Sequence, residues 1–112
     1  MIYLASPYSH PIQEIVEDRV RQTMKCLAAL LRQGKFVWSP IIHNHDMTVL
    51  YDLPKDAKYW QRFSIDFLRK ADGLYVLKLP GWRESVGVAE EITFANSIYL
   101  PTTYLLPEDY LK

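Results

Sequence analysis

The sequence predicts an α/β domain in which parallel strands alternate with helices. Short apolar runs are bounded by turn-forming residues, and longer segments with apolar residues at three- and four-residue steps lie between them. Strands that alternate with helices pair in parallel through right-handed crossovers. The length of 112 residues corresponds to one domain, so we expect a single domain over residues 1–112.

Each expected element follows from one of these patterns. The first two strands stop at the pairs Ser6-Pro7 and Ser39-Pro40, and Gly34 ends the first helix. In chain order, the expected elements are a strand at residues 2–5, a helix at 11–33, a strand at 35–38, a helix at 55–71, a strand at 73–77, a helix at 87–97 and a strand at 103–106.

The segment 41–54 shows no clean period, so we expect an irregular or functional loop there. A short polar tail follows the last strand. The order of the remaining elements predicts a small flavodoxin-like three-layer sandwich with a parallel sheet of four to five strands.

Composition and charge indicate the class of partner. Thirteen basic and thirteen acidic residues give a net charge of zero, which favours a small-molecule partner over a nucleic acid polymer or a membrane surface. No run approaches the roughly 20 apolar residues of a membrane span. Cys26 is the only cysteine, and residues 1–6 lack the features of a signal peptide, so we expect a cytoplasmic protein. A short chain has little room to enclose a deep pocket, and a homo-oligomer would fit.

Ligands of open α/β sheets bind beyond the carboxyl ends of the strands. This rule selects the loops at residues 6–10, 39–46 and 79–87. Aromatic side chains there suit stacking on a base, and His43 follows soon after a strand end. The expected substrate-binding residues of these loops are Ser6, Tyr8, Ser39, His43 and Trp82.

The most informative segment is 81–95, which joins a buried strand to a helix. Ser85 and Gly87 stand at the helix entrance, where free backbone N–H groups favour an anion and Gly87 lets a ligand approach closely. Glu91 falls in or just after the first turn, where the helix dipole favours its ionised form. Such a carboxylate is suited to attack on an anomeric carbon. The alternative is that Ser85 is only a cap and that Glu91 only compensates the dipole.

The arrangement Ser-x-Gly-x-x-x-Glu-Ile-x-x-Ala at residues 85–95 resembles the signature of nucleoside 2-deoxyribosyltransferases and the related nucleoside 5′-monophosphate N-glycosidases. The first strand with its Tyr3 and the pair Ala71-Asp72 before the third strand are similar too. Residues 3–10 and 79–85 look more closely like a bacterial and phage branch of this group.

The resemblance implies roles for individual residues. Glu91 matches the nucleophile that forms a glycosyl–enzyme intermediate, and Tyr3 matches a tyrosine that holds its geometry. Ser85 matches the serine that contacts a 5′-phosphate in the hydrolases. The family's helix carboxylate is replaced here by Ser64, and the nearest acid, Asp66, is expected to assist departure of the base. No metal or other cofactor is implied.

One family residue has no counterpart at its usual place. The hydrolases carry an arginine in the first loop, where this chain has Ser9. Arg19, Arg83 or His10 could supply the missing positive charge, and the sequence does not choose between them.

The predicted function is cleavage or exchange of the N-glycosidic bond of a (deoxy)nucleoside or nucleoside 5′-monophosphate. One alternative is a non-catalytic nucleotide-binding or sensing module on the same fold. A second is a metal-dependent hydrolase that uses His43, His45 and Asp46, although no second cluster of His or Cys accompanies them.

Overall fold

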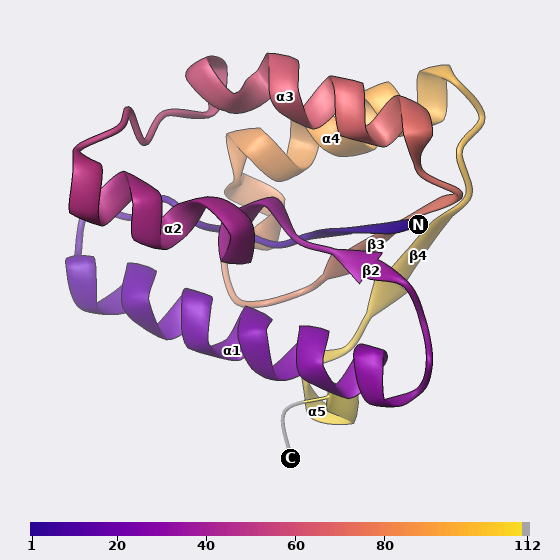
Figure 1. Cartoon of the computed structure of the whole chain (residues 1–112), viewed down its shortest axis with the longest axis horizontal. Helices are drawn as coiled ribbons and strands as arrows, with labels where there is room; N and C mark the ends of the chain where they lie inside the picture. The colour runs from indigo at the N-terminus through magenta and orange to yellow at the C-terminus, as the bar shows by residue number, and fades with distance from the viewer. Residues whose placement is uncertain (111–112) are drawn as a thin grey trace.

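A computed structural model describes residues 1–110 and shows a parallel sheet between helices (Figure 1). The strands are β1 (Ile2–Ala5), β2 (Val37–Trp38), β3 (Gly73–Leu77) and β4 (Thr102–Leu105). The helices are α1 (Gln13–Arg32), α2 (Pro40–Tyr51), α3 (Ala57–Lys70), α4 (Val86–Ser97) and α5 (Pro107–Tyr110), with a short 3-10 helix, η1 (Trp82–Glu84), before α4.

The four strands are all parallel and lie in the order β2-β1-β3-β4. This order confirms the predicted flavodoxin-like α/β sandwich with a parallel sheet. The chain leaves β1 towards one edge of the sheet and leaves β3 towards the other. The crevice between the loops that follow β1 and β3 is therefore the place where the topology favours a ligand.

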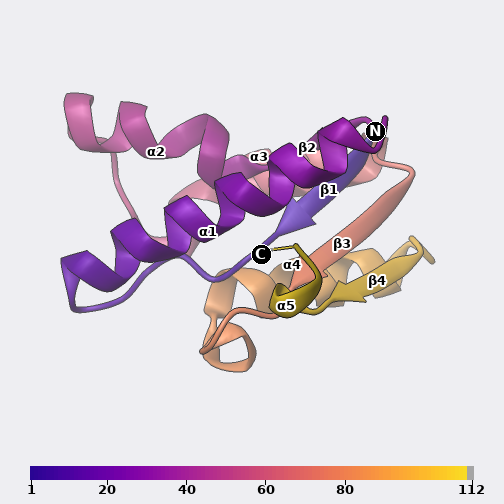
Figure 2. The same ribbon diagram turned by 90° about the horizontal axis from the view of Figure 1, so that it is seen from below.

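The sheet is covered on both faces. Helices α3 and α4 lie over one face, while α1 and α5 lie against the other (Figures 1 and 2). Alternate side chains of β1 enter the two cores: Tyr3 and Ala5 pack towards α3 and α4, and Leu4 packs in the core that includes Cys26 of α1. Continuous apolar strands are what burial on both faces requires. No helix within residues 1–110 combines the length and apolar character needed to cross a membrane.

The prediction of an irregular loop at residues 41–54 is wrong, because most of this segment is helix α2. Ser39 caps the helix by accepting a hydrogen bond from the Ile42 amide at 3.3 Å, and Pro40 occupies its first turn. Asp52 ends it in a left-handed conformation. The buried residues of α2 include the polar His45 and Thr48, so its buried face carries no apolar period.

The other predicted elements differ from the structure mainly at their ends. The strand at residues 73–77 is found as predicted, and the other strands and helices begin or end within about two residues of their predicted bounds. The expected tail contains the short helix α5 over residues 107–110.

Candidate active site

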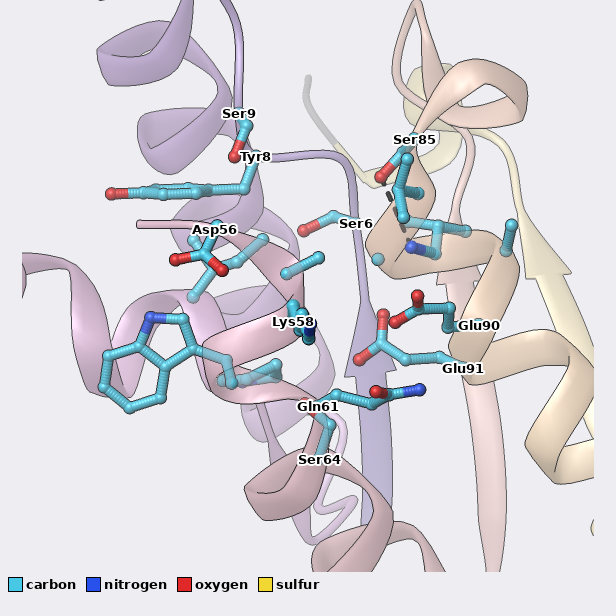
Figure 3. Close-up of a pocket in the computed structure, with 18 of the residues that line it drawn as sticks. Ser6, Tyr8, Ser9, Asp56, Lys58, Gln61, Ser64, Ser85, Glu90 and Glu91 are labelled. Atoms are coloured by element: carbon cyan, nitrogen blue, oxygen red, sulfur yellow. Dashed lines mark hydrogen bonds between the residues drawn. The ribbon is translucent and has the colours of Figure 1, made fainter. Parts of the chain in front are cut away.

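A cavity of about 920 Å³ opens at the carboxyl ends of β1 and β3, where the topology favours a ligand (Figure 3). Its walls come from the loop after β1, one face of α2, one face of α3 with the residues just before it, and α4 with the loop before it. Of the residues singled out in the sequence, Ser6, Tyr8, Ser85, Gly87 and Glu91 all line this cavity.

Tyr3 and Glu91 meet at the bottom of the site. Tyr3 is fully buried on the α3/α4 face of β1, and its hydroxyl donates a hydrogen bond to Oε2 of Glu91. Burial raises the pKa of Tyr3 well above its usual value, and the negative charge of Glu91 raises it further. Tyr3 therefore keeps its proton and acts as a fixed donor to the carboxylate.

The charge state of Glu91 is set by burial. Burial raises the pKa of Glu91 to about 7, the hydrogen bond from Tyr3 opposes this rise, and the negative charge of Glu90 adds to it. Glu91 is the sixth residue of α4, beyond the first turn in which the helix dipole acts strongly. The dipole was expected to favour the ionised form, and desolvation outweighs it. At neutral pH the carboxyl therefore holds its proton far more readily than an ordinary glutamate does.

The entrance of α4 is ordered by Ser85. Its hydroxyl accepts a hydrogen bond from the Val88 amide at 3.3 Å, which makes Ser85 the N-cap of the helix. At Gly87, an added Cβ would meet only the Ala57 Cβ at 3.9 Å, so the glycine leaves open space beside the helix entrance. Ser85 thus acts as the cap and also lines the cavity.

Two residues of the first loop face the cavity as expected. The buried Ser6 hydroxyl lies 2.9 Å from that of Thr23 in α1. The Tyr8 hydroxyl lies 2.8 Å from Nδ1 of His45 in α2. Both side chains therefore have fixed positions before any ligand binds.

The family model described as a domain of unknown function, DUF1937, matches residues 1–104. The chain belongs to the DUF1937 family. None of the curated proteins matches it.

In this DUF1937 chain, His45 takes the place expected for His43. His43 is exposed, with its ring 5.6 Å from that of Trp38, and it does not line the cavity. His45 is buried and does line it. The difference follows from the helical conformation of α2, because positions two apart point to nearly opposite sides of a helix.

Asp66 does not reach the site either. Its side chain is exposed and lies outside the cavity, whereas Ser64, two residues earlier in α3, lines it. A step of two residues turns a side chain by about 200° around a helix, and α3 is not rotated to compensate. The side chain of Ser64 is a hydrogen-bond partner of Tyr3. The expected helix acid is therefore absent from the cavity.

Ser39 and Trp82 also lie outside the cavity. Ser39 is buried as the cap of α2. Trp82 packs against the core next to α4, with its ring 5.7 Å from that of Tyr104 and the Arg83 guanidinium 5.2 Å from its centre. The loop turns at Gly81 and η1, which directs Trp82 back onto the domain.

Sequence reasoning missed several residues of the cavity wall. Glu90 lines the cavity beside Glu91, and both carboxylates point into it (Figure 3). Figure 3 shows Asp56 and Lys58 facing it from the start of α3, and Trp60 lines it as well. The position of Glu90 next to Glu91 in the sequence could have identified it. The residues of α3 reach the cavity only through tertiary packing, which the sequence pattern does not reveal.

Arg19 joins the two loops that flank the crevice. Its guanidinium donates from Nη1 to the Ser9 carbonyl at 2.8 Å and from Nη2 to the Pro80 carbonyl at 3.1 Å. Gly81, with a φ of 90°, makes room for it, since an added Cβ would lie 2.5 Å from Nη2. Arg19 and His10 line a pocket of about 300 Å³ that shares Ser9, Glu84 and Ser85 with the main cavity. Of the three basic candidates, these two lie beside the site.

The residues named for a metal site do not converge. His43 and Asp46 are exposed, whereas His45 is buried with hydrogen bonds to Tyr8 and Glu17. Within residues 1–110, no three side chains of His, Cys, Asp or Glu are grouped so that they could hold a metal ion.

Proposed function

We propose that this DUF1937 chain cleaves or exchanges the N-glycosidic bond of a (deoxy)nucleoside or nucleoside 5′-monophosphate, with Glu91 as nucleophile. The observation that carries this proposal is the Glu91 carboxylate, fixed by the buried Tyr3 inside a cavity beside the entrance of α4. A positioned carboxylate, desolvated and free of a cationic partner among residues 1–110, suits attack on an anomeric carbon.

The reaction follows from this geometry. The ionised Glu91 attacks C1′ of the sugar and forms an ester bond to it as the C1′–N bond breaks. Tyr3 holds one carboxylate oxygen and directs the other towards the substrate. Water then hydrolyses the ester, or a second base displaces it, and Glu91 is released.

The entrance of α4 supports a substrate with a 5′-phosphate. The Val88 amide is bound by Ser85, so the backbone N–H groups of Val86 and Gly87, the Ser85 hydroxyl and the open space at Gly87 form the anion-binding arrangement. An uncharged residue at position 85 avoids the repulsion that an aspartate would exert on phosphate. Arg19 adds a positive charge beside Ser85 in the adjoining pocket, which the carboxylate of Glu84 also lines.

The test is release of free base. Purified protein is incubated with a panel of deoxynucleoside and nucleoside 5′-monophosphates, and free base is measured by chromatography. We expect release from at least one nucleotide, with loss of activity in Glu91→Gln. Glu14→Gln, which removes a carboxylate from the exposed side of α1, is the matched control and should retain activity. No release at high enzyme concentration, or equal release by Glu91→Gln, would contradict the proposal.

A second candidate is a non-catalytic nucleotide-binding module. The position of Asp66 outside the cavity favours it, because the helix acid expected from the resemblance to the transferases is then missing. This candidate requires that a nucleotide raises the melting temperature of wild type and Glu91→Gln alike, with no base released by either. The two measurements together separate binding from catalysis.

The expected assembly and compartment form part of the same proposal. Tyr59, Phe63 and Phe67 expose apolar surface along α3, which supports a homo-oligomer. Light scattering coupled to size-exclusion chromatography tests it, and a monomeric mass at working concentration would count against it. The single buried Cys26 suits the reducing environment of the cytoplasm.

A further inference from the structure

The proposed reaction lacks a proton donor for the departing base. A neutral base leaves as an anion unless it is protonated, so an acid is needed near the base rather than near the sugar. Asp66 lies outside the cavity, and the hydroxyl of Ser64 is a weak acid at neutral pH. The remaining wall contains one hydrogen-bonded chain of titratable groups that the reaction has not used.

This hydrogen-bonded series consists of Tyr8 from the first loop, His45 from α2 and Glu17 from α1. The Tyr8 hydroxyl lies 2.8 Å from Nδ1 of His45, and Nε2 of His45 lies 3.2 Å from Oε2 of Glu17. The Tyr8 and His45 rings meet edge to face, with centres 5.6 Å apart. His45 is only 7% exposed, and both it and Tyr8 line the cavity.

The position of Tyr8 in the cavity fits contact with a base. Figure 3 shows Tyr8 and Asp56 on the wall that faces Glu90 and Glu91 across the cavity. A sugar placed at Glu91 would therefore direct its base towards Tyr8. The Tyr8 backbone is held by Arg19, which donates to the carbonyls of Tyr8 and Ser9.

The proton positions follow from the partners. The Glu17 carboxylate only accepts, so Nε2 of His45 carries a hydrogen in both protonation states. Nδ1 of neutral His45 then accepts a hydrogen bond from the Tyr8 hydroxyl. Protonated His45 donates from Nδ1 to the Tyr8 oxygen, and the Tyr8 proton turns towards the cavity. The three hydrogen-bonded side chains therefore deliver a proton at Tyr8 when His45 is charged.

The charged groups around the chain suit this role. Burial raises the pKa of Tyr8, and the negative charge of Glu17 raises it further, so the phenol stays protonated and gives up its proton only as His45 replaces it. A hydrogen bond from Gln13 lowers the pKa of Glu17, and His45 and Arg21 also lower it against the opposing effect of burial, so its carboxylate stays charged beside Nε2 of His45. Asp56, Lys55 and Lys58 face the same cavity from the start of α3.

From this geometry, and resting on the proposed function, we infer that the Tyr8–His45–Glu17 chain is the proton relay for the departing base. Tyr8 contacts the base and donates a proton to it, and His45 then gives Tyr8 a new proton. Glu17 is a positioning residue that fixes the His45 ring.

The proton and electron balance closes over two half-reactions. In the first, a Glu91 oxygen bonds to C1′, and the electron pair of the C1′–N bond passes into the base. The Tyr8 proton moves to a ring nitrogen of the base, N7 in a purine, and the Nδ1 proton of His45 moves to Tyr8. In the second, water attacks C1′ and the Glu91 ester bond breaks. The proton from water returns through Tyr8 to His45.

The test compares two substrates that differ at N7 of the base, and therefore in their need for a proton. A purine deoxynucleoside 5′-monophosphate must be protonated as it leaves, whereas its N7-methylated form already carries the positive charge and leaves as a neutral base. With enzyme in excess over substrate, base release reports the first half-reaction alone, and we expect Tyr8→Phe and His45→Gln each to slow it for the first substrate by about 10²- to 10⁴-fold. Release from the methylated substrate should stay close to the wild-type rate. The double variant should be no slower than the slower single variant.

Glu90→Gln is the comparison variant, because Glu90 also points into the cavity beside the nucleophile. If Glu90→Gln shows the substrate-selective loss and the relay variants do not, Glu90 is the acid and the inference is overturned. Equal slowing of both substrates by Tyr8→Phe and His45→Gln also overturns the inference, since these side chains would then only shape the wall of the cavity. If circular dichroism shows that Tyr8→Phe does not fold, the test is made with His45→Gln alone.

Failure of the proposed function gives a different result. Glu91→Gln must stop release from both substrates whether or not the relay exists. If wild type releases no base, or if Glu91→Gln releases it at the wild-type rate, both the proposed function and the relay are rejected. If Glu91→Gln stops both substrates while the relay variants are not selective, only the relay is rejected.

Discussion

Replacing Glu91 by Gln should stabilise the folded protein at alkaline pH. The carboxyl has an ordinary pKa of 4.5 when unfolded and a pKa of about 7 in the folded protein, where burial disfavours its charge. At about 1.4 kcal/mol per pKa unit, this difference corresponds to about 3 kcal/mol. Part of the side chain remains open to the cavity, so this figure is an upper bound.

The direction of the pH dependence follows from proton binding. Between pH 4.5 and about 7, the folded state holds the Glu91 proton and the unfolded state has released it. The contribution of this group to the free energy of unfolding is therefore complete below pH 4.5. It is lost as the pH rises to about 7 and stays lost above that. Gln is neutral throughout and still accepts the Tyr3 hydrogen bond, so the variant lacks this loss.

The assay is urea unfolding of wild type and Glu91→Gln at intervals from pH 4.5 to 8.5. We expect the free energy of unfolding of the variant, relative to wild type, to rise by up to about 3 kcal/mol across this range. Other groups that titrate in both proteins cancel in the difference. Glu14→Gln, on the exposed side of α1, should give a flat difference curve. A flat curve for Glu91→Gln would refute the reasoning, because the carboxylate would then be hydrated as in the unfolded chain.

Three further outcomes are expected. Tyr3→Phe removes the hydrogen bond that lowers the pKa of Glu91, so the acid limb of kcat/KM against pH should move to higher pH, and an unmoved limb would contradict this role. Gly81→Ala should lower the free energy of unfolding by about 1 kcal/mol or more, measured in urea, because of its positive φ and its contact with Arg19. Ser85→Asp keeps a helix cap but adds a negative charge, so turnover of a 5′-monophosphate relative to the free nucleoside should fall by about tenfold or more. An unchanged ratio would remove Ser85 from the phosphate site.

Much of the fold could be predicted from local patterns. Buried parallel strands are short apolar runs, and the strand at residues 73–77 was predicted with its bounds as found. The apolar stripes of α1 and α3 identified these helices in the same way. Helix α2 was missed because its buried side chains include a histidine and a threonine, which give no apolar period. The cap at Ser39 and the following Pro40 were its only local signals.

By itself, the sequence determined the alternation of strands and helices and the segment that carries Glu91. The motif at Glu91 and the resemblance to the transferases also predicted that Tyr3, 88 residues earlier, lies beside Glu91. Only the tertiary structure decided which polar side chains of α2 and α3 face the cavity. His45 faces it while His43 does not, and Ser64 faces it while Asp66 does not. The physical reason is that the rotation of a helix about its axis is fixed by packing against its neighbours. A step of two residues, which local pattern does not resolve, moves a side chain to nearly the opposite side.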